Sequence, residues 1–490
     1  MVGSSRIKLV DYVNLLKRNR LYRLLCMSEG INNIGEWLTL VATIEVGKRM
    51  ANGGGTIVST IYALRRIPSI VLFPITGVMA DMHDRGKILV ASLALDAVVV
   101  AILPFTEMTR NIWCFYGIVL LQFTIAAFLT PARNALAPMI VPIQDMQLQA
   151  TLDSIMWAAI GALGACIGGF ATALLGTTFC FQLDSATYIV GALLSVNLIG
   201  LPFKPTTPIP ALPEKKAVPS FAAMNSFGGP IDGLHHEVLI FEKNWGTENL
   251  FVKPAQHRFP SFLSFMIRVF LECGATFGDG LRYIVKRENR HVAFLAMIKG
   301  CGSLIWGVAD ILYVQLAEHP NLQVFGGTSS TIGLFYGVSC LGSIVGPLVS
   351  NSFTSASPKA LLDWIGISFL LMGLSYTLMC LNSGLLMLLF TIVMRAAGGE
   401  ILYTYSSTLL QIEVESDMRG RVAALEDVFC SLCGVGSAVF IGVASDRLGL
   451  SERHAVVVMA LISYWFASQC WALSVRYQKR FKMTENIASE

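Results

Sequence analysis

Charged and amide side chains lie inside several long apolar runs of this sequence, where only a specific role would keep them. The first run carries Glu29, Asn33 and Glu36. Spacings of four and three residues put these side chains on one face of a helix. A charge at the centre of a bilayer costs at least about 2.5–3.5 kcal/mol on insertion scales, so such a face does not favour lipid. We therefore expect it to line a polar cavity or to pair with another helix.

Other apolar runs carry charges of both signs. Arg65 lies in the second run, Lys299 and Asp310 are about three helical turns apart, and Arg395 is followed by Glu400. The predicted substrate or coupling-ion cavity is lined by Glu29, Asn33, Glu36, Arg65, Lys299, Asp310, Arg395 and Glu400. The alternative is that these groups form ion pairs between neighbouring helices and only fix their packing.

Four further acids receive a purely structural interpretation. Asp96 and Asp184 lie close to predicted helix ends, which favours capping or snorkelling. Glu426 and Asp427 would open the eleventh apolar helix, where acids suit the positive N-terminal dipole. None of the four is included in the predicted cavity.

The apolar runs that hold these groups arrive in two sets of six. A bilayer core is about 30 Å thick and needs about 20 apolar residues of helix. Charged residues make up only 14% of the chain, against roughly 25% in soluble domains. Strands of a membrane barrel would be shorter and alternating. The sequence therefore predicts an all-α polytopic membrane protein, with twelve transmembrane helices in two six-helix, pseudo-symmetric repeats. The runs lie near 24–47, 56–80, 88–106, 112–130, 153–175, 181–201, 292–315, 330–351, 361–381, 384–408, 424–445 and 454–475.

Short sequence matches between the halves indicate an internal duplication. Gly30 and Gly302 differ by 272 positions, and Gly54-Gly55-Thr56 recurs as Gly326-Gly327-Thr328 at the same offset. Two parallel repeats are typical of one class of secondary transporters. We predict an N-terminal six-helix half at 1–202 and a C-terminal six-helix half at 271–490. Between them lies a cytosolic insert at 203–270, rich in proline and ending in a short interfacial helix.

The distribution of basic residues predicts the orientation. Outside the insert, sixteen Lys and Arg residues flank the predicted helices on the side of both termini, Arg133 among them, against five on the other side. By the positive-inside rule, both termini face the cytosol. We expect a multi-pass protein of the plasma membrane rather than of an organelle.

Several segments of the sequence resemble a known transporter family. After the second run comes Gly77-Val78-Met79-Ala80-Asp81-Met82-His83-Asp84-Arg85-Gly86-Lys87. It resembles the loop motif Gly-x-Leu-Ala-Asp-Arg-x-x-Arg-Arg-x of the major facilitator superfamily. Asn33–Leu38, Pro131–Leu136 and Asp417–Val422 are similar to further segments of that family, best to its bacterial-type branch of siderophore and drug exporters. The resemblance covers nearly all of both halves.

The resemblance implies a gate as well as a fold. The residues of this cytosolic gate would be Gly77, Asp81, Arg85, Lys87, Asp417, Arg419 and Arg421. The sequence also departs from the family pattern. Met82 and Gly86 replace residues that are usually basic, and the fourth predicted helix lacks the arginine that proton-coupled antiporters of the family often carry. These departures weaken the prediction of proton coupling but not that of transport.

The sequence thus predicts a secondary active transporter that exports a small organic solute by alternating access, coupled to a proton or another ion. Its partners would be the lipid bilayer, the solute and the coupling ion. One alternative is a transporter for lysophospholipid or another amphiphile. Another is a transporter-like receptor or scaffold that does not transport. The insert would serve a partner or trafficking.

Enzymatic, metal-binding and nucleic-acid functions are not expected. The sequence has no Gly-x-x-x-x-Gly-Lys-Ser/Thr for ATP and no Ser-His-Asp order. Cys430 and Cys433 have the spacing of a redox or metal pair but sit in an apolar helix without further ligands, so we interpret them as packing residues. No cofactor is expected. The basic residues flank helices instead of clustering, which disfavours nucleic-acid binding.

Overall fold

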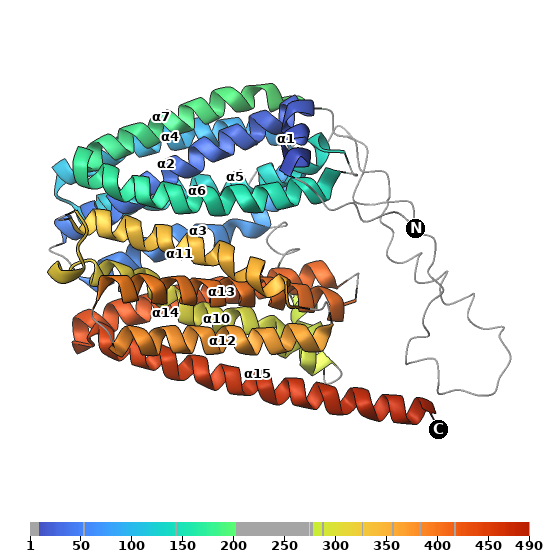
Figure 1. Ribbon diagram of the computed structural model, residues 1–490. Helices are drawn as coiled ribbons and strands as arrows, with labels where there is room; N and C mark the ends of the chain where they lie inside the picture. The colour runs from blue at the N-terminus through green and yellow to red at the C-terminus, as the bar shows by residue number, and fades with distance from the viewer. Residues whose placement is uncertain are drawn as a thin grey trace. The chain divides into compact units, whose positions relative to one another are not determined.

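Long α-helices dominate the part of the chain that the structure describes. The computed structural model describes residues 9–51, 54–142, 145–201, 274, 278–286, 289–325, 327–354, 357–381, 384–415 and 418–489. Each of the twelve predicted apolar runs lies mainly on one long helix, α2 to α7 or α10 to α15, which confirms the all-α fold class (Figure 1). The helices are α1 (Leu9–Arg18), α2 (Arg20–Met50), α3 (Gly55–Met82), α4 (Arg85–Thr109), α5 (Ile112–Ile140), α6 (Met146–Leu175), α7 (Thr177–Ser195), η2 (Val196–Leu198), α10 (Arg290–Leu316), η5 (Pro320–Leu322), α11 (Thr328–Asn351), α12 (Pro358–Leu381), α13 (Leu385–Glu413), α14 (Arg419–Leu448) and α15 (Glu452–Ser489).

Many helices extend beyond the apolar runs that marked them. α5 continues through Pro131 to Ile140 instead of ending near 130, and α14 begins at Arg419 instead of near 424. An apolar run marks the part of a helix that meets hydrocarbon, whereas the backbone hydrogen bonds continue into the polar ends. The added turns place Arg133 within α5 and Glu426 two turns inside α14.

The helices have the composition of a multi-pass integral membrane protein. Among the described residues, eleven helices are long and apolar enough to cross a membrane. α2 is not in this set, and its sequence holds Glu29, Glu36 and Glu45 among its apolar residues. Large apolar side chains such as Phe105 and Trp465 are exposed, as expected for helices that face lipid tails.

The twelve long helices form two halves, seen as the blue-to-green and yellow-to-red groups in Figure 1. The halves meet where α6 packs on α11 and where α3 packs on α14. α3 and α11 are each the second long helix of their half, and α6 and α14 are each the fifth. Each contact therefore pairs the fifth helix of one half with the second helix of the other, and a twofold rotation that superposes the halves converts one contact into the other. This agrees with the predicted pseudo-symmetry.

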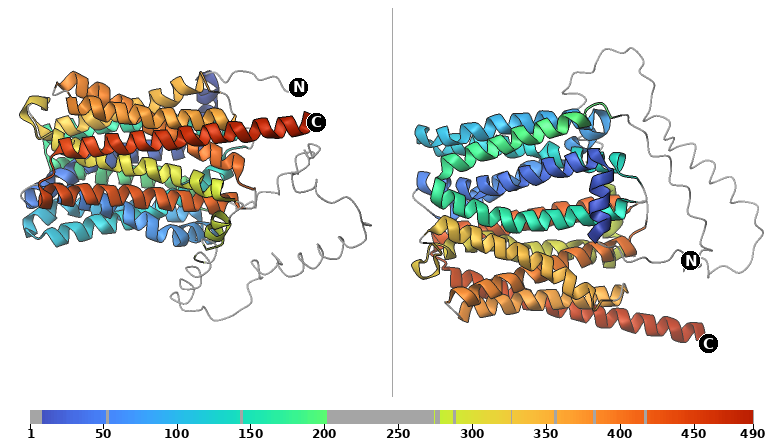
Figure 2. Two further views of the ribbon diagram at one scale, coloured as in Figure 1. Left: turned by 90° about the horizontal axis from the view of Figure 1, so that it is seen from below. Right: turned by 45° about the horizontal axis from the view of Figure 1, so that its top comes forward.

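The short helix α1 lies across the end of the bundle at which α2 begins (Figures 1 and 2). Its Leu15 is buried against a small apolar cluster that includes Tyr22 of α2 and Val141 after α5. Both halves belong to one compact unit. The predicted insert at 203–270 and its interfacial helix lie outside the described residues, so their prediction stands untested.

Candidate functional site

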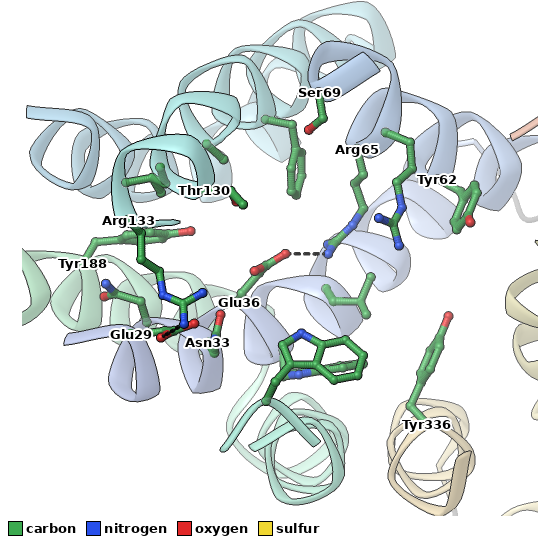
Figure 3. Close-up of a pocket in the computed structure, with 18 of the residues that line it drawn as sticks. Glu29, Asn33, Glu36, Tyr62, Arg65, Ser69, Thr130, Arg133, Tyr188 and Tyr336 are labelled. Carbon is green, nitrogen blue, oxygen red and sulfur yellow. Dashed lines mark hydrogen bonds and ion pairs between the residues drawn. The ribbon is translucent and has the colours of Figure 1, made fainter. Parts of the chain in front are cut away.

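A cavity of about 630 Å³ lies between the halves, and most of its wall comes from the N-terminal half (Figure 3). α2 contributes the polar row of Glu29, Asn33 and Glu36, and the lining also includes Arg65 of α3 and Asp310 of α10. Five of the eight predicted cavity residues thus share one space. Aromatic rings and further charges complete the wall: Trp37, Tyr62, Arg66, Phe123, Arg133, Trp157, Tyr188 and Tyr336.

Glu36 and Arg65 form an ion pair inside this cavity. Arg65 Nη2 lies 2.9 Å from Glu36 Oε1, and the dashed line in Figure 3 marks this contact. The Arg65 guanidinium also lies over the ring of Phe123, 4.6 Å from its centroid, which favours the cation through the electron-rich ring face. The carboxylate is 41% exposed and the arginine 17%, so Glu36 is the member of the pair that a solute or water reaches more easily.

A second cluster of charges lies one to two turns nearer the start of α2. Arg133 Nη2 lies 2.6 Å from Glu29 Oε2 and 3.1 Å from Asp153 Oδ2 of α6. Asp153 also accepts a hydrogen bond from the hydroxyl of Tyr22 at 2.8 Å. One arginine therefore holds two carboxylates from two helices, at the wall of the cavity.

Arg133 corrects one expectation from the sequence, which placed it in a basic flank outside the predicted helices. That placement is wrong, because α5 continues through Pro131 and carries Arg133 to the cavity. That the fourth helix lacks the family's antiporter arginine stays a prediction. The helix was predicted to end near residue 130 because the apolar run stops at Pro131. The resemblance of Pro131–Leu136 to a segment of the family was the sequence signal that this region has a function.

The C-terminal half supplies a smaller part of the wall. Asp310 lines the cavity beside Tyr336, and its electrostatic partners include Arg66 from the other half. Arg395 is buried and is not among the lining residues. Its guanidinium donates to the Tyr313 hydroxyl at 3.0 Å and to Ser339 Oγ at 2.9 Å. Since Ser339 lines the cavity, Arg395 supports the wall from behind.

Lys299 and Glu400 are also not among the lining residues. Lys299 is only 3% exposed, with Nζ 2.7 Å from Asp427 Oδ1 and 3.8 Å from Glu426 Oε2. Glu400 interacts electrostatically with the same lysine. Asp427 and Glu426 therefore serve as partners of a buried cation. The interpretation that they cap the start of their helix is wrong, because α14 begins two turns earlier.

The structure also replaces the interpretation of Asp96 and Asp184. Both side chains are fully buried, at 0% exposure. Asp96 lies near the middle of α4 (Arg85–Thr109) and Asp184 two turns inside α7 (Thr177–Ser195). Capping or snorkelling at a helix end is therefore wrong for both, because neither side chain reaches the surface.

The predicted gate motif surrounds the turn between α3 and α4. Gly77 and Asp81 lie in the last turns of α3, and Lys87 is exposed at the start of α4. Arg85 donates from Nε to the Ala80 carbonyl at 2.9 Å and from Nη1 to the Ala135 carbonyl of α5 at 3.3 Å. Arg85 thus holds the turn against α5.

Close packing explains why a glycine stands at position 86, where the family pattern has a basic residue. Asp84 accepts hydrogen bonds from the backbone N–H of Gly86 at 2.9 Å and of Gly200 at 2.8 Å, so it caps α4 and ties to it the segment that follows η2. A Cβ on Gly86 would collide with the carbonyl of Leu198. A basic residue at position 86 would therefore push this segment away.

The second gate segment lies at the start of α14. Arg419 Nη2 donates to the Val414 carbonyl at 3.4 Å, and Arg421 Nη1 lies 4.0 Å from Asp279 Oδ2. Asp417 lies outside the described residues.

Several contacts join the halves at the opposite end of the bundle. Asp446, near the end of α14, accepts hydrogen bonds from the backbone N–H of Gly55 and Thr56, both at 2.8 Å. α3 has no side-chain cap of its own, because its N-cap residue is Gly54. An acid of one half thus caps a helix of the other. An ion pair between Lys48 and Glu318 and a hydrogen bond from Ser329 Oγ to Glu45 Oε2 at 3.1 Å add to this closed end.

Close packing of α6 on α11 supports the same junction. A Cβ on Gly333 would lie 2.5 Å from the Ala165 carbonyl oxygen and 2.6 Å from the Gly169 Cα. Only glycine permits this approach of the two backbones. Gly164 and Gly168 of α6 pack on Trp37 of α2.

The chain is similar in sequence to one protein family and to several transporters. The family model described as Major Facilitator Superfamily matches residues 25–438. Macrolide efflux protein A of Streptococcus pyogenes is 22% identical over 409 residues, which cover 82% of this chain and 83% of that protein. The MFS-type transporter YkuC of Bacillus subtilis is 30% identical over 139 residues, which cover 28% of this chain and only 32% of YkuC.

Solved structures resemble this chain in fold over nearly its whole length. A POT family transporter in complex with 5-aminolevulinic acid superposes with a TM-score of 0.64 at 14% identity, covering 94% of this chain and 96% of that one. A mutant of the nucleoside transporter NupG gives a TM-score of 0.62 at 12% identity, covering 92% and 99%. Within the described residues, no group of three or more His, Cys, Asp or Glu side chains is placed to hold a metal ion.

Proposed function

This chain belongs to the Major Facilitator Superfamily, and we propose that it is a secondary active exporter of a small, amphiphilic organic solute. That it is a multi-pass membrane transporter and not an enzyme follows from the family and from the fold. Substrate, direction and coupling belong to the proposal. Export is favoured by the likeness to Macrolide efflux protein A.

The cavity carries the proposal. It combines aromatic rings with the Glu36–Arg65 pair and the Glu29–Arg133 pair. Rings offer flat apolar surface, and paired charges can exchange partners with a charged group of a solute. This wall suits a molecule with an apolar body and one charged end. A lysophospholipid has the same chemistry and remains the alternative substrate.

Alternating access requires the closed end to open. The contacts at that end are a few hydrogen bonds, one ion pair and the close packing of α6 on α11 at Gly333. Their modest number suits a junction that breaks and re-forms in each cycle. With both termini in the cytosol, as the basic residues indicate, the closed end would be the outer one. The solute would then enter the cavity from the cytosol.

Glu36 and Glu29 are the proposed coupling acids. Each is paired with an arginine at the cavity wall, and either a proton or the cationic end of a solute can take the place of that arginine. Because proton and solute compete for the same carboxylate, inward movement of the proton is exchanged for outward movement of the solute, without any cofactor. Arg133 in α5 supports this coupling, because it gives Glu29 a cationic partner at the cavity wall in addition to Arg65 and Arg66.

Efflux from sealed vesicles tests the proposal. Purified protein would be reconstituted and assayed with a fixed panel that includes a labelled macrolide and a labelled lysophospholipid, with and without an imposed pH gradient. Glu36→Gln and Glu29→Gln should abolish gradient-driven accumulation while sparing exchange. Glu107→Gln, which alters an acid paired with Arg49 3.4 Å away and outside the cavity, is the matched control. Retention of gradient-driven efflux by both single variants and by the double variant would refute the assigned roles.

A further inference from the structure

Behind the cavity wall lies a buried acid whose charge nothing in the described structure compensates. Asp96 of α4 is 0% exposed, and neither of its carboxylate oxygens has a hydrogen-bond partner among the described residues. Gln122 of α5 is 1% exposed and interacts with Tyr188 of α7. Groups this deeply buried are normally hydrogen-bonded.

The elements around Asp96 bring further acids to it. Ser185 Oγ donates to the Ala97 carbonyl at 2.7 Å, which fixes α7 against α4 next to both Asp96 and Asp184. Asp184 in turn accepts hydrogen bonds from the hydroxyls of Thr39 and Thr187. The electrostatic neighbours of Asp96 are Asp184 and Glu36, both carboxylates.

Cations are scarce at this place. Arg65 is the arginine whose charge reaches Asp184, and it is already paired with Glu36. Arg66 also interacts electrostatically with Glu36, but the charged neighbours of Asp96 among the described residues are the carboxylates of Asp184 and Glu36, so an ionised Asp96 has no cation beside it. An isolated carboxylate in an apolar interior is so costly that it takes up a proton instead. Asp184 has two hydroxyl donors and Glu36 has water and Arg65, so Asp96 is the acid with the least support for a negative charge.

Tyr188 connects this acid to the cavity. It lines the cavity, and in Figure 3 its side chain projects toward the middle of the pocket. It also interacts electrostatically with Asp96, Asp184 and Glu36. Tyr188 is thus an electrostatic neighbour of both the cavity acid and the two buried acids.

We propose that Asp96 is a proton-binding site behind the cavity and that its proton exchanges with Glu36. When Glu36 is protonated, Arg65 is released and can compensate the negative charge of Asp184 and of ionised Asp96. When Glu36 is ionised, it holds Arg65, and the proton resides on Asp96. One proton thus moves between two carboxyl groups past Tyr188. This inference extends the proposed proton-coupled transport, but the proton on Asp96 is measurable without any solute.

Infrared difference spectroscopy on the full-length protein in vesicles tests the site. A buried, protonated carboxyl group has a carbonyl stretch that disappears on ionisation, so wild-type protein should lose one such band as the pH rises. Asp96→Asn should lack that band at every pH. Asp363→Asn should retain the band, because Asp363 lies in the C-terminal half, where its carboxylate accepts a hydrogen bond from Ser474. An identical band in wild type and Asp96→Asn would overturn the assignment.

Two further arms keep the test decisive. If Asp96→Asn does not fold, Asp96→Glu should shift the band instead of removing it, and an unshifted band would contradict the proposal. Glu36→Gln removes a negative neighbour and frees Arg65, so the band should vanish at lower pH than in wild type. An unchanged midpoint would show that the two acids are not linked. Measurements in sodium and in choline chloride should agree, and loss of the band in sodium alone would identify the bound cation as sodium.

Discussion

Removing the carboxylate of Asp446 should open the closed end of the cavity. Its two oxygens accept the backbone N–H groups of Gly55 and Thr56, each at 2.8 Å. These groups begin α3, which has no cap of its own. When the halves separate at this end, water replaces the carboxylate. Asp446→Ala therefore weakens the closed arrangement and leaves the open one nearly unchanged.

The magnitude follows from the two interactions that are lost. Replacing an N-cap side chain by alanine costs about 0.5–2 kcal/mol. A negative charge at a helix N-terminus contributes about 0.3–1 kcal/mol. The two effects overlap, so we expect a loss of about 1–2 kcal/mol, which changes the ratio of closed to open molecules roughly 5- to 30-fold.

Double electron–electron resonance between two spin labels measures this ratio. Arg110→Cys in the turn between α4 and α5 and Arg453→Cys at the start of α15 place one label on each half, at the closed end. The exposed Cys114 would be replaced by serine. Asp446→Ala should increase the long-distance population. Glu452→Ala is the matched control, because that acid pairs with His319 within the same half at 3.6 Å. Equal distance distributions for wild type and Asp446→Ala would refute the reasoning.

Two other substitutions test the packing inside and between the halves. Lys299→Met leaves the buried Glu426 without its cation, so we expect a loss of about 3–5 kcal/mol and a clear drop in thermal midpoint. The double variant Lys299→Met/Glu426→Gln should recover much of it, and a single variant as stable as wild type would contradict the buried pair. Gly333→Ala forces a methyl group against the Ala165 carbonyl oxygen, and overpacking of about 1–3 kcal/mol should shift the same spin-label distances toward the open form. Gly117→Ala, with nothing within 4 Å of the added carbon, is its control. Equal effects of the two substitutions would show that the close contact between α6 and α11 does not stabilise the closed end.

The sequence alone predicted the fold because membrane insertion depends on local composition. A helix must satisfy its backbone within one segment, so each apolar run could be recognised without knowledge of its neighbours. The helical period likewise grouped Glu29, Asn33 and Glu36 on one face of α2, and the structure places all three at the cavity.

The predicted helix boundaries were wrong where a helix continues beyond its apolar residues into a polar end. α5 passes through Pro131 and carries Arg133 onward to Glu29 and Asp153. Neither the apolar run nor the charge count could show this, since both treat a polar helix end as a loop.

Pairing between distant helices was decided by the tertiary structure. Lys299 and Asp310 share one side of α10 in the sequence pattern, yet Lys299 pairs with Glu426 and Asp427 while Asp310 lines the cavity. The buried position of Asp96 and the capping of α3 by Asp446 likewise depend on contacts with other helices. Spacing along one helix fixes which side chains share a face, but only packing decides whether that face meets water, lipid or an opposite charge.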